Sequence, residues 1–585
     1  MTSNRENEQY QPGFITRTDL GGALPPTPQV EMDSALAELG AHKELWSALD
    51  LGERIKILDQ ILLDLHDVGE EWVAACVQAK GTQGNDYAEA EDWVQLAYTF
   101  RNIRLLADSL RDIQRSGRPH IPGPVDTLPG GQVRAQVFPV DRYDSMVFSG
   151  MTAEVWMQPG VSLKEVLDNQ AWFYHQEPGS GKVTLILGAG NGAMLIPTDF
   201  LYKLFVEGSV VLLKMNPVND YIGPIISKGF RALIDRGFLR IVYGGAQEGS
   251  YLCHHTSVDE LHMTGSDKTF EAIVFGPGVE GQKRKAERRP LIEKRFTCEL
   301  GNVTPVIVVP GPWTAKEIDA WGEKLARWLV INAGFNCLTP RLIIQHAGWE
   351  HRHDLIDAIG ENLARVETRE AYYPGARQRH EEFLAAHPSC DQHGVATGGQ
   401  LPWTLIRDVD AGNTDDICFK NEAFCSMFAE TALAGGDVPS FLASAVSFAN
   451  EHLWGNLTAT MIVHPQSLQD SLVAQAVDRA VADLRYGTVL INQYAAFGFF
   501  AMTTPWGAYP GNDIYDIESG TGVTCNTLMF HSPQKTVVRN PFMISPDPMS
   551  LHSRTGKEIS QKLVELQFKP SPWKLPGVLW SAIRS

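Results

Sequence analysis

Apolar residues recur at three- and four-residue steps through residues 34–115, the first long patterned part of the chain. This spacing places them on one face of an α-helix. In ERIKILDQILLDLHD the residues that follow it are Ile55, Leu58, Ile61, Leu62 and Leu65. A second helical run follows in AEDWVQLAYTFRNIRLLADSLRDI. We therefore predict a helical N-terminal region behind a polar, flexible arm over residues 1–30.

The pattern then changes to short β-rich runs. Between residues 131 and 160 these runs are broken by turn residues, as in a hairpin. Farther on, strand-like runs alternate with helical ones, first in VTLILGAG, SVVLLK, LRIVYGG and ELHMTGS. A second such region covers residues 302–500, with the strand candidates PVIVV, RLIIQ, TATMIVH and GTVLIN. Such alternation predicts an α/β protein with two parallel-sheet domains covered by helices.

Composition narrows the class of function. The 585 residues suffice for two to four folded units, and the formal net charge of −19 disfavours nucleic acid as the main partner. The eight cysteines form no C-x-x-C pair and have no metal-type spacing to histidine, so we predict no metal site and a reducing, cytoplasmic location. No apolar run approaches the roughly 18 residues that span a membrane.

A glycine-rich stretch, LILGAGNGA, fits the G-x-G-x-x-G/A pattern of dinucleotide sites at residues 185–193. In such sites an acidic residue about 20 positions farther on usually binds the ribose. The next strand, SVVLLK, instead ends in Lys214. The glycines alone are therefore weak evidence for a phosphate-binding loop.

Two more residues are candidates for chemistry, Glu299 in CELGN and Cys337 in GFNCLTPR. A cysteine is a nucleophile only as its thiolate, which needs a helix terminus or a cationic neighbour to lower the thiol pKa. A single cysteine is more often a small buried apolar residue. Only the motifs around Glu299 and Cys337 can indicate whether the two residues are catalytic.

Taken in their order, LILGAGN with VVLLK, ELHMTGS, CELGN, GFNCLTPR and KNEAFCSMF resemble the motifs of the aldehyde dehydrogenase superfamily over about residues 35–540. The resemblance implies that Cys337 is the nucleophile, Glu299 the general base and Asn191 a donor to the substrate oxyanion. It also implies NAD or NADP as cofactor. The residues that would bind it are Lys214, Thr264, Gly265, Ser266, Glu422 and Phe424.

The resemblance also implies the fold, an α/β aldehyde-dehydrogenase-like arrangement of two Rossmann-like parallel-sheet domains plus a β-hairpin oligomerisation domain. Because the family's hairpin adds strands to a neighbouring subunit's sheet, we expect a homodimer or homotetramer. The domains expected after the arm are the N-terminal helices of the cofactor domain (31–130), the oligomerisation hairpin (131–160), the NAD(P)-binding domain (161–300), the catalytic domain (301–505), a return to the cofactor and oligomerisation region (506–545) and a C-terminal extension (546–585).

Four residues depart from the family's motifs. Asn302 replaces the last glycine of E-L-G-G, Phe335 replaces a glutamine, and Gly190 replaces an aromatic residue. Pro217 replaces the acidic residue three positions after the lysine, which removes a partner for a ribose 2′-hydroxyl and the repulsion of a 2′-phosphate. NADP is therefore as good a candidate as NAD.

The predicted reaction is oxidation of an aldehyde to a carboxylic acid with NAD(P)⁺, through a cysteine thiohemiacetal and thioester. One alternative is a CoA-dependent acyl reductase (acylating aldehyde dehydrogenase), and another is a catalytically silent scaffold with the same fold. Four phenylalanines are candidates to line a tunnel for an apolar or long-chain aldehyde, although such residues are as often core: Phe335, Phe497, Phe499 and Phe500.

Overall fold

The computed structural model describes residues 24–177, 179–544, 547 and 549–585. Most of the predicted arm, residues 1–23, therefore lies outside the described residues. The described chain opens with four helices, α1 (Gln29–Ser47), α2 (Leu51–Asp67), α3 (Gly69–Lys80) and α4 (Asp86–Ser116). Ile55, Ile61 and Leu65 are buried on one face of α2, which confirms the predicted helical spacing.

A six-stranded sheet has the order β19-β8-β7-β4-β5-β6. Its five long strands are parallel: β4 (Val183–Leu187), β5 (Val210–Lys214), β6 (Leu239–Val242), β7 (Glu260–Thr264) and β8 (Phe296–Glu299). The short β19 (Gly520–Thr521) pairs with β8 in the antiparallel sense. Its associated helices are α7 (Leu195–Phe205), α8 (Gly223–Gly229), α9 (Arg231–Ile234), α10 (Ala246–His254), α11 (Asp267–Val274) and α12 (Gly278–Ala286). Because the strands are parallel, the polar residues after β4, β5, β7 and β8 lie at one edge.

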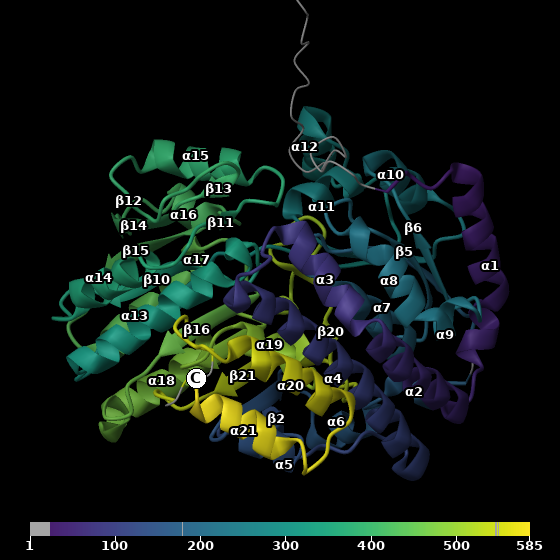
Figure 1. The fold of residues 1–585 in the computed structure, drawn as a ribbon, viewed down its shortest axis with the longest axis horizontal. Helices are drawn as coiled ribbons and strands as arrows, with labels where there is room; N and C mark the ends of the chain where they lie inside the picture. Colours follow the sequence, from purple (N-terminus) through teal and green to yellow (C-terminus); the bar gives the residue numbers. More distant parts are fainter. Residues whose placement is uncertain (1–23, 178, 545–546, 548) are drawn as a thin grey trace, which may run out of the picture.

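An 11-stranded mixed sheet forms the second half of the molecule, on the left in Figure 1. Its middle strands are parallel: β9 (Thr304–Val308), β10 (Pro340–His346), β14 (Trp403–Val409), β15 (Met427–Leu433), β16 (Thr458–Ile462) and β17 (Thr488–Ile491). Four of these match predicted strands, whereas β14 and β15 were not predicted. Antiparallel β12 (Asp391–His393) closes one end. Among the helices here are α13 (Ala315–Val330), α14 (Arg352–Leu363), α15 (Ala376–Ala386), α16 (Ile417–Lys420), α17 (Val438–His452), α18 (Ser471–Asp483) and α19 (Ala496–Phe500).

The other end of this sheet is built by the predicted hairpin. It consists of β2 (Val133–Phe138) and β3 (Thr152–Met157), with helix α5 (Arg142–Val147) between them and β1 (Val125–Thr127) beside β2. Strand β21 (Pro533–Arg539) pairs with β3 and, in parallel, with β17. These strands therefore extend this chain's own sheet, whereas the resemblance led us to expect that they extend a neighbouring subunit's sheet. Oligomer formation remains a prediction.

The C-terminal segment folds as α20 (Gly556–Phe568) and α21 (Leu575–Ile583). Helix α20 packs along α4, as Figure 1 shows. The Phe568 ring stacks on His66 with centroids 4.1 Å apart, which ties the extension to the N-terminal helices. In the part of the chain that the structure describes, no helix combines the length and apolar character needed to cross a membrane.

Candidate functional site

A cleft of about 1020 Å³ opens at the carboxyl ends of β4, β5, β7 and β8. Its opposite wall comes from residues 373–424 of the second half of the molecule. All nine residues selected from the sequence line this cleft: Asn191, Lys214, Thr264, Gly265, Ser266, Glu299, Cys337, Glu422 and Phe424. The fold thus brings widely separated motifs to one place.

Cys337 and Glu299 form a hydrogen-bonded pair in this cleft. The Cys337 Sγ donates to Glu299 Oε1 at 2.9 Å. Glu299 ends β8 and is 3% exposed, and its Oε2 is buried with no hydrogen-bond partner among the described residues. A thiol and a carboxylate in contact can exchange a proton, so this pair can form a thiolate nucleophile and a general base.

The turn that presents Cys337 has a constrained backbone. Asn332 and Gly334 have positive φ angles of 54° and 81°. A Cβ atom at Gly334 would lie 2.4 Å from the Cys425 carbonyl oxygen, so this position requires glycine. The Asn332 side chain holds the turn by donating to the backbone oxygen of Asn191 at 2.8 Å. Strained backbone of this kind is typical of functional sites.

Burial dominates the electrostatics of the pair. It raises the pKa of Glu299 to about 7; the Asp199 carboxylate adds to this rise, and the hydrogen bond from Cys337 opposes it. Burial, followed by the charge of Glu299, raises the pKa of the Cys337 thiol well above its usual range. The resting nucleophile is therefore a neutral thiol, which needs a base in direct contact to become reactive.

Asn191 follows β4 and is tied to the segment that precedes Cys337. Its Nδ2 donates to the backbone oxygen of Phe335 at 2.9 Å. A Cβ atom at Gly190 would lie 2.9 Å from Asn216 Oδ1. The Asn216 side chain therefore occupies the space beside Gly190, which explains why no aromatic residue stands there.

Two helix N-termini and a lysine border another part of the cleft. Lys214 ends β5 and is 8% exposed. The first turn of α10 and the Thr264-Gly265-Ser266 segment before α11 line the cleft with it. Ser266 caps α11, since its Oγ accepts from the Thr269 N–H at 3.2 Å. Helix N-termini favour anions such as a pyrophosphate.

Glu422 and Phe424 form part of the opposite wall. A Cβ atom at Gly301 would lie 2.1 Å from Glu422 Oε2, so the glycine of CELGN makes room for this carboxylate. The Glu422 Oε1 is buried and has no hydrogen-bond partner among the described residues, which suits a hydroxyl donor from a ligand. Burial raises the pKa of Glu422 to about 7, and Arg341 opposes this rise. Phe424 packs against Tyr373, with ring centroids 4.9 Å apart.

The four phenylalanines considered for a substrate tunnel do not line this cleft. Phe335 is 1% exposed, and its ring stacks on Tyr373 with centroids 5.8 Å apart. Phe497, Phe499 and Phe500 lie in α19, where they fill space between packed elements. The aromatic residues that do line the cleft are Tyr373, Phe383, Phe424 and Trp454.

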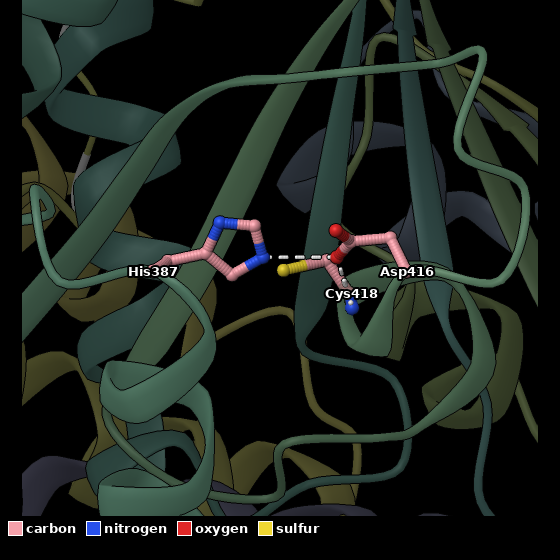
Figure 2. A group of neighbouring side chains, drawn as sticks. All are labelled: His387, Asp416 and Cys418. Carbon is pink, nitrogen blue, oxygen red and sulfur yellow. Dashed lines mark hydrogen bonds and ion pairs between the residues drawn. The ribbon is translucent and has the colours of Figure 1, made fainter.

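A histidine, an aspartate and a cysteine, residue types that can bind a metal ion, lie together outside the cleft. No metal site was predicted from the sequence. The potential ligand atoms of His387, Asp416 and Cys418 lie within 4.8 Å of one another, and the three side chains point toward one another (Figure 2). His387 Nε2 lies 2.9 Å from Asp416 Oδ1, which also accepts from the Cys418 N–H at 2.9 Å. Asp416 thereby caps α16, and burial raises the pKa of the Cys418 thiol. These contacts explain the cluster as a helix cap.

Comparison with known proteins agrees with the geometry. A model of the aldehyde dehydrogenase family matches residues 146–373. The N-succinylglutamate 5-semialdehyde dehydrogenase of Novosphingobium aromaticivorans is 24% identical over 208 residues, which are 35% of this chain and 39% of that protein. The aligned part of this chain thus spans well under half the length of that curated relative.

Solved structures resemble the chain over nearly its whole length. An aldehyde dehydrogenase of Mycobacterium tuberculosis, complexed with NAD⁺, has a TM-score of 0.57 at 16% identity and covers 90% of this chain and 92% of its own. Glyceraldehyde-3-phosphate dehydrogenase GapN of Methanocaldococcus jannaschii, complexed with NADP, has a TM-score of 0.57 at 15% identity, with 88% and 95% covered. The likeness establishes the fold.

Proposed function

We propose that the chain is a divergent member of the aldehyde dehydrogenase superfamily and that it oxidises an aldehyde to a carboxylic acid with NAD or NADP, through a thioester on Cys337. The observation that carries the proposal is the 2.9 Å contact between Cys337 Sγ and Glu299 Oε1 in the wall of the cleft. The free cysteines of the described chain also suit the cytoplasm, which we propose as the location.

The residues of the cleft fit the cofactor. The buried, unpartnered Oε1 of Glu422 offers an acceptor for a ribose hydroxyl, and the N-termini of α10 and α11 offer N–H groups for a pyrophosphate. Lys214 at the end of β5 would bind the adenosine ribose or its phosphate. When bound, the nicotinamide supplies the acceptor for a hydride. NADP stays as good a candidate as NAD because Pro217 stands at the position where the family has an acidic residue.

The first half of the mechanism uses the contact between thiol and carboxylate. Glu299 takes the thiol proton while the sulfur bonds to the aldehyde carbon, which gives a thiohemiacetal. The developing oxyanion accepts a hydrogen bond from the second Asn191 Nδ2 hydrogen. Removing one such donor typically costs roughly 3 kcal/mol of barrier. Loss of the hydride then leaves the acyl group on Cys337 as a thioester.

In the second half Glu299 acts as the base for water. After it has released the thiol proton to solvent, its carboxylate takes a proton as the water oxygen bonds to the thioester carbon. The carbon–sulfur bond breaks, the electron pair returns to the Cys337 sulfur, and the proton on Glu299 then restores the resting thiol. The buried Oε2 of Glu299 is available for this contact because no described residue bonds to it. CoA in place of water would give the acyl-transfer alternative, but the presence of Glu299 favours hydrolysis.

The pH dependence of hydrolysis follows from the raised pKa of Glu299. Only the ionised carboxylate can accept a proton from water, so the steady-state rate should be proportional to the ionised fraction of Glu299. We therefore expect the rate to rise with pH through about 7. Steady-state rates between pH 5.5 and 9, with saturating substrate, test this. A rate that is flat from pH 5.5 to 8 contradicts the assignment.

Replacing Lys214 by alanine should weaken cofactor binding without changing the chemistry. Loss of a charge-assisted hydrogen bond costs ~1.5–3 kcal/mol, so we expect the cofactor KM to rise about tenfold to a hundredfold with kcat nearly unchanged. The KM of Lys214→Ala should be measured with NAD and with NADP. The cofactor whose KM rises more is the one whose adenosine end Lys214 contacts. Lys228→Ala, on the surface of α8 and paired with Glu71, is the control. Equal cofactor KM values for Lys214→Ala and Lys228→Ala would refute the assignment of Lys214 as a cofactor-binding residue.

The reaction itself can be tested with purified protein, a panel of aldehydes that includes long-chain and carboxylate-bearing members, and either cofactor, with and without CoA. We expect reduced cofactor to form without CoA and one acid to appear per cofactor reduced. A strict requirement for CoA would support the acyl-transfer alternative. No turnover with any combination would support the silent scaffold.

A further inference from the structure

The proposed oxyanion donor, Asn191, stands between two glycines in LILGAGNGA. Gly190 and Gly192 have no side chain to limit their backbone angles, so the chain on either side of Asn191 is less restricted than ordinary backbone. A hydrogen-bond donor lowers a reaction barrier only where it is held in place before the charge develops. The aim of the Asn191 amide must therefore be fixed by contacts from other segments.

Asn332 and Tyr372 supply these contacts. Asn332 Nδ2 donates to the backbone oxygen of Asn191 at 2.8 Å. The Tyr372 hydroxyl lies 3.1 Å from the same oxygen and 3.0 Å from Asn332 Oδ1. The hydroxyl thus orients the Asn332 amide, with its oxygen toward Tyr372 and its nitrogen toward Asn191. The position of Asn191 consequently depends on where Asn332 is held.

Asn332 itself lies in a turn with an unfavourable backbone conformation. Its φ angle is 54°, and the next two residues, Ala333 and Gly334, have φ angles of 53° and 81°. Three consecutive residues therefore adopt left-handed conformations, and two of them carry a side chain. Such backbone persists only where the surrounding contacts determine it. The turn therefore needs an anchor from outside.

Glu91 on helix α4 provides this anchor. Its Oε2 accepts a hydrogen bond from the Asn332 N–H at 2.9 Å. Arg369, on the short strand β11 (Arg369–Glu370), donates to Glu91 Oε1 and Oε2 at 2.9 and 3.0 Å. The side chains of Glu91 and Arg369 are 10% and 7% exposed. Burial raises the pKa of Glu91 and the Arg369 charge opposes the rise, so Arg369 favours the ionised carboxylate, which is the stronger acceptor.

A continuous set of contacts thus ends at Asn191. We call it the support network, and its members are Glu91, Arg369, Asn332 and Tyr372. None of these four residues lines the cleft, whereas Asn191 does. The support network therefore acts on a bound substrate only through the residues that it holds.

We propose that Glu91 and Tyr372 are positioning residues, which aim the Asn191 amide at the substrate oxygen by fixing Asn332. This rests on the proposed function, in which Asn191 donates to the thiohemiacetal oxyanion. The tetrahedral intermediate of thioester hydrolysis places negative charge on the same oxygen. An amide that is no longer aimed should therefore slow acylation and hydrolysis alike.

Two processes should not depend on the aim of Asn191. Cofactor binding uses other parts of the cleft. Alkylation of Cys337 by iodoacetamide displaces iodide from carbon without forming an oxyanion, and the mass of the peptide that contains Cys337 reports it. Both measurements therefore check that the cleft and the pair of Cys337 and Glu299 are intact in a variant.

The test uses Glu91→Ala and Tyr372→Phe, each made alone and together with Asn191→Ala. Glu91→Ala removes the acceptor for the Asn332 N–H. Tyr372→Phe removes only a hydroxyl and keeps the ring, so it tests the same network with little change to the packing. After rapid mixing with aldehyde and cofactor, the burst of reduced cofactor reports acylation of the cysteine, and the later steady rate reports hydrolysis.

The matched control for Glu91→Ala is Asp144→Ala. Asp144 forms another buried ion pair with helix α4, through Arg101, and the two side chains are 3% and 1% exposed. Its removal also leaves a buried arginine without its acid. Asp144→Ala therefore reproduces a general loss of stability, and we expect its burst and steady rate to resemble those of the unaltered protein.

We expect Glu91→Ala and Tyr372→Phe each to slow the burst and the steady rate about tenfold, which is less than the effect of losing an oxyanion donor outright. The cofactor dissociation constant and the alkylation rate should stay unchanged. In the Asn191→Ala background the same two changes should have almost no further effect, because the donor that they aim is already absent.

Losses that multiply in the Asn191→Ala background overturn the proposal, because Glu91 and Tyr372 would then act independently of the donor. Alkylation that slows as much as turnover also overturns it, since the network would then control the thiol. So does an equal loss in Glu91→Ala and Asp144→Ala, or a burst that Tyr372→Phe leaves unchanged. Tyr372→Phe alone decides the outcome if Glu91→Ala yields no folded protein. Absence of a burst in the unaltered protein contradicts the proposed function itself.

Discussion

Replacing Cys337 by alanine abolishes aldehyde oxidation in our account while the cleft still binds cofactor. The sulfur is the only atom that forms a covalent bond to the substrate, so we expect kcat/KM to fall by roughly four orders of magnitude or more, with no burst of reduced cofactor. Steady-state absorbance of the reduced nicotinamide measures the loss, and cofactor titration of the same variant checks that the cleft is intact.

The control for this variant is another buried cysteine. Cys298 lies on β8, next to Glu299 in the sequence, but its side chain does not line the cleft, so Cys298→Ala is a matched control. We expect it to retain most of the activity. Turnover undiminished in Cys337→Ala, or lost equally in both variants, would contradict the assignment of Cys337 as the nucleophile.

Replacing Glu299 by glutamine should remove turnover while the thioester still accumulates. Glutamine keeps the size of the side chain but cannot take a proton from water, so the steady rate should fall about a hundredfold to ten-thousandfold. Attack by the thiol should also slow, because the raised pKa of Cys337 leaves little thiolate without a base. At high pH the burst should recover in Glu299→Gln while the steady rate does not.

Glu299→Asp provides the comparison for this variant, since it keeps a carboxylate but withdraws it from Cys337 by one methylene. We expect a partial loss, with the rise of rate with pH preserved. A Glu299→Gln variant that turns over at the rate of the unaltered protein would rule out the general base and leave CoA or another acceptor to resolve the thioester.

Much of the fold was predictable because its strands are short apolar runs between helices. The motifs also selected nine residues that lie together in one cleft, although they come from distant segments. Two of the parallel strands in the larger sheet were missed: in WTLIRDV and MFAETAL, polar and charged residues interrupt the apolar run. Arg407 in the first of these strands pairs with Asp391 and Asp357, so the strand accommodates a charged residue through contacts that the sequence does not display.

The pairing of β21 with β17 of the same chain could not be predicted from the sequence. A pattern of apolar residues predicts a strand, but it does not specify whether the neighbouring strand belongs to the same chain or to another subunit. The buried polar side chains behind Glu299, by contrast, had a visible signal in the sequence. The positions Asp199, Lys203 and Glu207 repeat every four residues, and polar residues alternate along ELHMT and RFTCE. Strand alternation by itself predicts which face is buried, and it does not show which polar residues lie behind Glu299.

The most direct test of the account is the intact mass of the Glu299→Gln variant after mixing with aldehyde and cofactor at high pH, followed by peptide mapping. We predict that each chain gains the mass of the aldehyde less two hydrogens, that the adduct maps to the peptide containing Cys337, and that one cofactor is reduced per chain. Reduced cofactor without an adduct, or an adduct on a different residue, would contradict a thioester on Cys337.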